Sequence, residues 1–449
     1  MSDNISSISP NQPIISPVKL TWSDPVWVLK RAIWTYFFLL IFEGALRKWF
    51  LPGLATPLLI VRDPVALYAI YVAYKNRMFP NVFYIKVVNY IALISVLATL
   101  AFGHGNLFVA LYGARPMWLH FPLMYIMGQV FVKEDVEQMG RAILWLALPM
   151  VVLIGLQFYS PQSALVNRGV GGSMEGAGFS GSGEFYRPPG TFSFTSGLVQ
   201  FFTLVAVFVF YVFIKNERIS KFLLYASAIA LLIAIPFSIS RSLIFNVVIE
   251  ILLLVLAVTN KPTYFKKILL IAALALPALL ILNETSFFQT ATGAMTDRYE
   301  SANEGEGGLE NVFVERFLGG MLRALEESTN YPFFGQGIGL GTNVGAQMLY
   351  GSVNGFTIAE EEWGRLIGEM GPLLGIIMIL IRSGFAFNMA FNSFRYMRKE
   401  NFLPWMLIGV GFLTFLQGQW APPTSVGFST IMGGMMLAGF KEKEEDSIV

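Results

Sequence analysis

The sequence predicts an all-α integral membrane protein, a polytopic bundle of about twelve transmembrane helices with a long outer loop between late helices. Of the 449 residues, 55% are hydrophobic and 13% are charged, about half the charged fraction of soluble domains. Apolar runs recur at about 20 residues, the length that crosses a bilayer as a helix. The longest polar interruption, residues 284–362, lies between late runs.

The apolar runs give the expected order of spans. They lie at 30–46, 57–74, 84–102, 107–131, 142–159, 191–214, 222–237, 242–258, 267–283, 363–382, 402–420 and 425–440. We therefore divide the chain into a polar cytoplasmic tail (1–29), nine helices with a glycine-rich outer loop near 160–190 (30–283), an outer loop expected to hold the active site (284–362), three further helices (363–440) and a charged cytoplasmic tail (441–449). The first tail lacks the pattern of a cleavable signal peptide.

Lysine positions orient the spans. If the N-terminus is cytoplasmic, every lysine except Lys48 falls on the cytoplasmic side, as the positive-inside rule expects. Both termini are then cytoplasmic, and the 284–362 loop faces outward.

Arginines follow a different pattern, since most fall at or near the outer face. The planar fork of arginine suits bidentate binding of phosphate or carboxylate, so the set indicates recognition of an anion at the membrane surface. The alternative for any single arginine is a snorkelling side chain that pairs locally with a carboxylate. The outer arginines are Arg47, Arg115, Arg168, Arg187, Arg241, Arg298, Arg316, Arg323 and Arg365, and Arg62 lies within a span.

Composition excludes several kinds of function. The chain has no cysteine and two histidines, His104 and His120, so we expect no disulfide, no thiol chemistry, no metal site and no cofactor. It has no basic tract, so we expect no nucleic-acid partner.

Three early motifs carry charge into the spans. Glu43 and Arg47 are four residues apart and share a helix face. The sequence Arg62-Asp63-Pro64 lies within the second predicted span, where ionisable residues indicate function or tie off a helix that the proline breaks. Arg115, in a segment that breaks a later span, is a candidate ligand for an anion, and we expect His120 nearby to be a packed core residue.

Three further motifs add outer arginines. Arg187 precedes Pro-Pro-Gly, which stiffens the backbone and makes this residue a candidate phosphate clamp. Arg241 lies in the short turn SISRS, as an anion ligand beside serines or as a boundary arginine. Arg316 and Arg323 are seven residues apart, so on a helix they share one face.

The end of the long loop combines glycines with carboxylates. The segment GQGIGLG, 335–341, lacks the context of a nucleotide site and predicts a tight turn with close backbone approach. A capping box from Thr357 to Glu360 predicts a helix from about Ile358.

On that helix, Glu362, Arg365 and Glu369 share one face. Glu361 and Glu362 are candidates for a general base at a dry boundary. The alternative is that they favour the dipole of the helix N-terminus.

With these motifs the chain resembles the bacterial O-antigen polymerase and O-antigen ligase family over about residues 187–375. The motifs that carry the resemblance are Arg187-Pro-Pro-Gly-Thr-Phe, Ser240-Arg241-Ser242, Arg316 and Arg323, Pro-Phe-Phe-Gly-Gln-Gly-Ile-Gly at 332–339, and Glu369-Met-Gly371. Ligase-like members often have a His-Asn pair before the late span, where this chain has Ala359-Glu-Glu-Glu362-Trp. A glutamate would then replace that pair, which favours a polymerase over a ligase.

The resemblance implies a metal-independent membrane glycosyltransferase of the GT-C kind, acting in surface polysaccharide synthesis at the bacterial inner membrane. Its donor would be an oligosaccharide linked to undecaprenyl or a related polyprenyl diphosphate, and its partners would include membrane lipids and other polysaccharide-assembly proteins. Arg187, Arg241, Arg316 and Arg323 would bind the diphosphate with help from Arg365. Further anion contacts would come from Arg47, Arg62 and Arg115, and Glu361 or Glu362 would activate the acceptor hydroxyl.

Two other classes of function remain open. A transporter or flippase for an anionic lipid-linked glycan predicts charges along a path through the midplane. A non-catalytic assembly scaffold predicts that the glutamates can be lost without effect.

Overall fold

The computed structural model describes residues 24–215, 219–259, 273, 277, 280–306, 319–351, 358–359 and 361–441. Within them the protein is helical apart from one short hairpin. Seven helices in the described part are long and apolar enough to cross a membrane, which indicates a multi-pass membrane protein. The predicted all-α membrane fold is confirmed at this level, while the count of about twelve spans stays a prediction.

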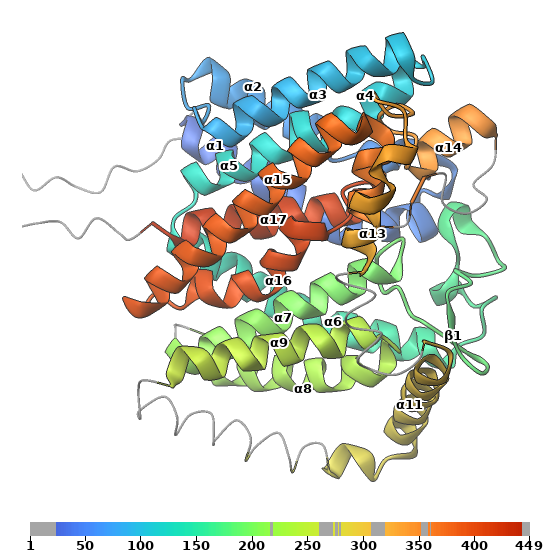
Figure 1. Ribbon diagram of the computed structural model, residues 1–449. Helices are drawn as coiled ribbons and strands as arrows, with labels where there is room; N and C mark the ends of the chain where they lie inside the picture. Colours follow the sequence, from blue (N-terminus) through green and yellow to red (C-terminus); the bar gives the residue numbers. More distant parts are fainter. Residues whose placement is uncertain are drawn as a thin grey trace, which may run out of the picture.

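The helices pack side by side, and the two ends of the bundle differ (Figure 1). The beginning of α1 and the end of α17 lie at the left of the view, whereas α11, α13, α14 and the hairpin lie at the right. The described helices of the 284–362 segment therefore lie at the end opposite the start of α1 and the end of α17, the arrangement expected from the lysine pattern.

The first part of the described chain supplies α1 (Pro25–Ala45), α2 (Asp63–Lys75), α3 (Phe83–Phe102), α4 (Leu107–Arg115), α5 (Phe121–Val130) and α6 (Lys133–Tyr159). Helix α1 begins five residues before the predicted span, because the Asp24 side chain caps it by accepting a hydrogen bond from the amide of Val26 at 2.8 Å. Helix α2 begins only at Asp63, after a 3-10 turn at Pro57–Ile60. The α-helix of the second predicted span therefore starts at the Arg62-Asp63-Pro64 motif, with Pro64 in its first turn.

The middle of the chain supplies α7 (Thr195–Lys215), α8 (Lys221–Phe237) and α9 (Arg241–Val258). Between α6 and α7, the glycine-rich loop carries an antiparallel hairpin of β1 (Ser180–Ser182) and β2 (Phe185–Tyr186), a feature that the sequence pattern did not predict. The predicted span at 267–283 lies mostly outside the described residues.

The predicted outer loop is largely helical where it is described. It contains α11 (Ser286–Glu306), α13 (Gly320–Glu326) and α14 (Asn343–Tyr350), and it leads to α15 (Glu362–Arg398), α16 (Leu403–Gln417) and α17 (Pro423–Gly439). The helix start predicted at Ile358 is wrong, because α15 begins at Glu362 with Glu361 as its N-cap. The other two capping-box residues, 357 and 360, lie outside the described part.

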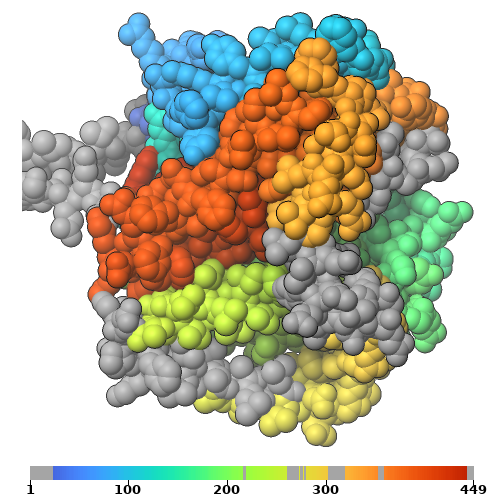
Figure 2. Space-filling model, viewed as in Figure 1, coloured from blue at the N-terminus to red at the C-terminus, as the bar shows by residue number. Residues whose placement is uncertain are grey.

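The core of the bundle lies around α7, which is buried along most of its length. Helices α6, α8, α9 and α16 pack against it, and α17 packs against α5. In the view of Figure 2, α15 runs across the surface between α3 and α9, and residues of the 320–341 region lie against its beginning.

A glycine-rich segment, residues 335–341, crosses close to the backbones of α4 and α15. Gly335, Gly337 and Gly339 have φ angles of 72°, 114° and 94°, which favour glycine. The amides of Gln336 and Gly337 donate to the carbonyls of Gly368 and Glu369 at 2.8 and 3.0 Å. Close to these bonds the helical dihedrals of α15 are interrupted at Gly371. The predicted tight turn with close backbone approach is confirmed.

The crossing of this segment with α4 predicts a specific sensitivity to one methyl group. A Cβ on Gly113 would lie 2.4 Å from the backbone nitrogen of Gly339. We expect Gly113→Ala to lower the unfolding free energy by about 1–3 kcal/mol through overpacking, although alanine favours a helix more than glycine does. Thermal unfolding in detergent measures the change.

The matched control is Gly53→Ala, because a Cβ there has no atom within 4 Å. Equal midpoints of thermal unfolding for Gly113→Ala and Gly53→Ala would contradict the close crossing of the two backbones.

Candidate functional site

Buried polar side chains gather where α1, α2 and α4 approach one another. We call this group the N-terminal cluster. Its members are Tyr36, Glu43, Arg47, Lys48, Arg62, Asp63, Arg115 and His120. Each is less than 9% exposed, so their charges interact in a medium of low dielectric constant.

Glu43 pairs with arginines from two elements. Its carboxylate lies 3.3 Å from Arg47 Nη1, one turn further along the chain, and 3.3 Å from Arg62 Nη2, in the turn before α2. The predicted local pairing of Glu43 with Arg47 is confirmed, and the pairing with Arg62 attaches the start of α2 to the end of α1.

Asp63, His120 and Tyr36 form a hydrogen-bonded chain. The two ring nitrogens of His120 lie 3.2 Å from Asp63 Oδ1 and 2.7 Å from the Tyr36 hydroxyl. Arg115 donates to the other Asp63 oxygen at 3.2 Å. His120 is thus buried, as expected from the sequence, but it is part of a polar chain that can carry a proton between a phenol and a carboxylate.

The N-terminal cluster contains more positive than negative charge. Three arginines (Arg47, Arg62 and Arg115) and Lys48 meet two carboxylates (Glu43 and Asp63). The Nε atoms of Arg62 and Arg115 are buried and have no hydrogen-bond partner. Buried donors without acceptors are costly, and an anion placed there would satisfy them.

The loop before α7 covers this cluster. Lys48 Nζ donates to the carbonyls of Gly190 and Phe192 at 2.7 and 2.9 Å, and Arg47 Nη1 donates to the Ser193 hydroxyl at 2.9 Å. Arg187 precedes Gly190 by three residues, so the two Cα atoms are at most about 11 Å apart. The segment that carries the predicted phosphate clamp thus leads directly into the loop that contacts Arg47 and Lys48.

The hairpin brings two further outer arginines together. Arg187 follows β2, and its amide donates to the Phe179 carbonyl at 3.0 Å. Arg241 begins α9 two residues after Ile239, whose Cδ1 would lie 3.1 Å from a Cβ on Gly181 of β1. Arg298 of α11 donates to the Gly181 carbonyl at 2.6 Å. The hairpin, the start of α9 and α11 thus meet at one place.

A second group, the α15 cluster, consists of Glu362, Arg365, Glu369 and Arg382. Glu362 accepts from Arg365 Nη2 and Nε, each at 2.8 Å, and from Arg382 Nη1 at 2.5 Å. Arg365 Nη1 donates to Glu369 at 2.5 Å, and the other Glu369 oxygen accepts from the amide of Gly341 at 2.8 Å. Two arginines and two carboxylates therefore balance each other.

The segment between α16 and α17 joins the two clusters. Arg382 donates to the carbonyl of Gly418 at 2.6 Å and lies 4.3 Å from the ring centroid of Trp420. Five residues after Gly418, the carbonyl of Pro423 accepts from Arg62 Nη2 at 2.6 Å. A short chain segment thus holds the two clusters side by side.

The predicted site residues fall into separate groups. Arg47, Arg62 and Arg115 meet in the N-terminal cluster, Arg187 and Arg241 lie in segments next to the hairpin, and Arg365 with Glu362 lies in the α15 cluster. Arg323 is exposed on α13. Glu361 is exposed too, and its Cγ would lie 2.9 Å from a Cβ on Gly320 of that helix. Arg316 lies outside the described residues.

Two features of the α15 cluster bear on the predicted roles. Both carboxylate oxygens of Glu362 accept hydrogen bonds from arginines, and Arg365 uses all three guanidinium nitrogens on carboxylates. The roles of Glu362 as a base and of Arg365 as a phosphate ligand therefore stay predictions. The geometry favours a role of both residues in holding α15 in place. Glu361 is the more accessible of the two candidate bases.

Sequence reasoning missed Tyr36 and Arg382 and underestimated His120. A signal for Arg382 is available, because an arginine within an apolar run indicates a buried partner. Tyr36 has no such signal, since tyrosines are common in apolar helices. Among the described residues, no three histidine, aspartate or glutamate side chains gather in a way that could hold a metal ion.

Comparison with protein-family models, curated proteins and solved structures finds no match to this chain. The residues of the clusters and their geometry therefore carry the functional information in this chain.

The α15 cluster predicts a strong dependence of stability on Glu362. Glu362→Ala would leave Arg382 and part of Arg365 buried without a carboxylate, so we expect a loss of about 3–5 kcal/mol in the unfolding free energy. Chemical or thermal unfolding in detergent measures this loss.

Glu326→Ala on α13 is the control, because Glu326 is exposed and substitutions of this kind usually change stability by less than about 0.5 kcal/mol. A Glu362→Ala variant as stable as the control would show that the cluster contributes little to the fold.

Proposed function

We propose that this protein is a membrane glycosyltransferase of the O-antigen polymerase or ligase type. It extends or transfers an oligosaccharide linked to polyprenyl diphosphate at the outer face of the bacterial inner membrane. The proposal includes about twelve spans, both termini in the cytoplasm and the 284–362 segment outside.

The excess of positive charge in the N-terminal cluster carries the proposal. Three arginines and Lys48 outnumber two carboxylates, next to the loop that carries Arg187. A diphosphate leaving group carries negative charge that would balance this excess, and arginine forks bind its oxygens well. By contrast, the balanced α15 cluster has little need of an anion.

The reaction that follows from this arrangement is a displacement at the sugar. An acceptor hydroxyl attacks the anomeric carbon, the bond from that carbon to the diphosphate oxygen breaks, and the lipid diphosphate leaves with the bonding electrons. The cations stabilise the charge that develops on the leaving oxygen. The hydroxyl proton passes to a base, for which exposed Glu361 is the first candidate, while Glu362 acts as a positioning residue.

One observation favours a second candidate, a transporter or flippase for an anionic lipid-linked glycan. Glu250 lies in the middle of α9 and is fully buried, and neither carboxylate oxygen has a hydrogen-bond partner. Ionisable groups at such a depth often belong to transport pathways. A protein that moves the lipid-linked glycan between leaflets without lengthening it would have this function.

The test is extension of a polyprenyl-diphosphate-linked oligosaccharide by the purified protein in lipid discs. We expect longer lipid-linked glycans and released lipid diphosphate from the wild-type protein. Arg187→Ala should lower turnover by about 10²–10³-fold, the usual effect of removing one group that stabilises transition-state charge. Arg187→Lys should recover part of this loss, because it keeps the charge without the fork.

Arg398→Ala is the control, since Arg398 lies at the far end of α15 and should keep full activity. Equal rates for Arg187→Ala and the wild type, with normal thermal unfolding, would contradict the role of Arg187. Movement of the lipid between leaflets with no longer product would favour the transporter.

A further inference from the structure

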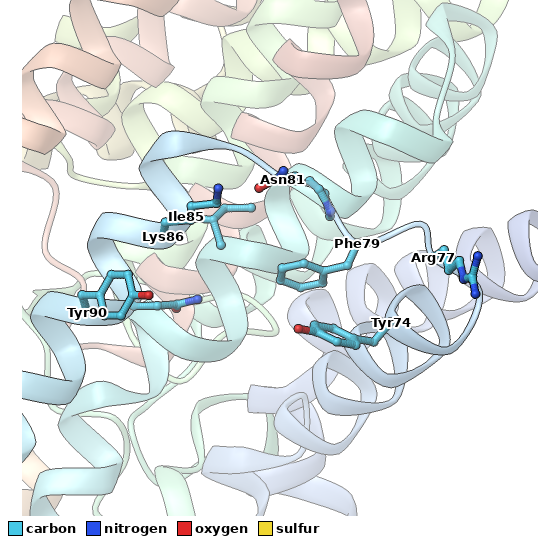
Figure 3. Close-up of a pocket in the computed structure, with 9 residues that line it drawn as sticks. Tyr74, Arg77, Phe79, Asn81, Ile85, Lys86 and Tyr90 are labelled. Atoms are coloured by element: carbon cyan, nitrogen blue, oxygen red, sulfur yellow. The ribbon is translucent and has the colours of Figure 1, made fainter.

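A cavity of about 520 Å³ opens between the end of α2 and the beginning of α3 (Figure 3). The turn that joins the two helices, with Arg77 and Phe79, forms one part of its wall. Lys86, Asn89 and Tyr90 of α3 form another. The cavity has no part in the charge clusters described above.

The lining of the cavity is positively charged. Arg77 and Lys86 line it, and none of its lining residues is acidic. Figure 3 shows Arg77 at one side and Lys86 with Tyr90 at the other, with the rings of Tyr74 and Phe79 between them. An elongated anionic group would therefore meet a cation at either end.

The cavity also offers an unused acceptor. The side-chain oxygen of Asn89 is buried and has no hydrogen-bond partner. The Asn89 carbonyl accepts from the indole of Trp118 at 3.3 Å, which holds this part of α3 in place. A ligand that donates a hydroxyl hydrogen would satisfy the side-chain oxygen.

The surroundings of the cavity are those of a membrane surface. Tyr74 and Tyr90 are 70% and 66% exposed, and Phe83 is 69% exposed. Exposed aromatic rings at the ends of apolar helices are typical of the bilayer interface. The helix ends here belong to the side that the lysines predict to be cytoplasmic, where anionic lipids attract cations.

We propose that this cavity binds the headgroup of an anionic glycerophospholipid. The phosphate lies in the cavity that Arg77 and Lys86 line, and a headgroup hydroxyl donates to the side-chain oxygen of Asn89. The acyl chains run along the exposed aliphatic face of α3, which includes Leu93 and Leu97. The site is separate from the proposed glycan chemistry and does not depend on it.

Native mass spectrometry of the full chain with added phosphatidylglycerol and phosphatidylethanolamine tests the site. We expect the wild-type protein to retain phosphatidylglycerol in preference to phosphatidylethanolamine. The double variant Arg77→Ala/Lys86→Ala should lose about 30-fold in relative affinity, because each cation near an anionic lipid changes the affinity by about fivefold. Asn89→Leu should weaken phosphatidylglycerol more than phosphatidic acid, which lacks the headgroup hydroxyls.

The control is Arg395→Ala/Lys399→Ala, which removes the same charge from the end of α15 on the same side of the bundle. Equal losses in the two double variants would overturn the proposal, because they would indicate a general electrostatic effect.

Glycerol 3-phosphate distinguishes a lipid from a soluble phosphate. If it displaces phosphatidylglycerol at micromolar concentration, the cavity is a soluble-phosphate site, and the lipid proposal is wrong. Unchanged thermal unfolding of each variant excludes loss of the fold as the cause.

Discussion

A charged side chain inside an apolar bundle requires a partner, and this requirement determines how the half of the bundle opposite the start of α1 packs. Removing a charge from water costs several kcal/mol, which a nearby opposite charge offsets only in good geometry. Glu362 has such partners, because it accepts hydrogen bonds from Arg365 and from Arg382, which lies 20 residues further along α15. The interruption at Gly371 lies between these two arginines, so one carboxylate connects the two parts of a broken helix.

The same requirement makes the two clusters differ in how they would bind an anion. In the α15 cluster each carboxylate oxygen has a donor, so an added ligand would have to displace a bond between protein groups. In the N-terminal cluster two guanidinium nitrogens have no acceptor and the cations outnumber the carboxylates. An anion that binds in the N-terminal cluster therefore adds hydrogen bonds. In the α15 cluster it would only replace hydrogen bonds that already exist. This difference is the physical reason for placing the diphosphate beside Arg62 and Arg115.

How much of this could be predicted from the sequence depends on the range of the interaction. Spacing along one helix predicts the pairs of Glu43 with Arg47 and of Arg365 with Glu369, because residues four apart always share a face. Hydropathy predicts the bundle but misplaces helix starts such as Pro25 and Asp63. At these positions a side-chain cap or a proline determines where the helix begins. Contacts such as Arg382 with Glu362, or Tyr36 with His120, join residues 20 and 84 positions apart, and no local pattern records them.

The two ends of the bundle use cations in opposite ways. At the end where α1 begins and α17 ends, Arg77 and Lys86 are exposed around an open cavity beside tyrosines. At the other end, Arg47, Arg62 and Arg115 are buried, and the loop before α7 contacts Arg47. Exposed cations keep their water and bind an anion weakly and reversibly, which suits a lipid that exchanges with the bilayer. Buried forks bind in a dry site where electrostatic interactions are strong, which is the environment that stabilising a leaving diphosphate demands.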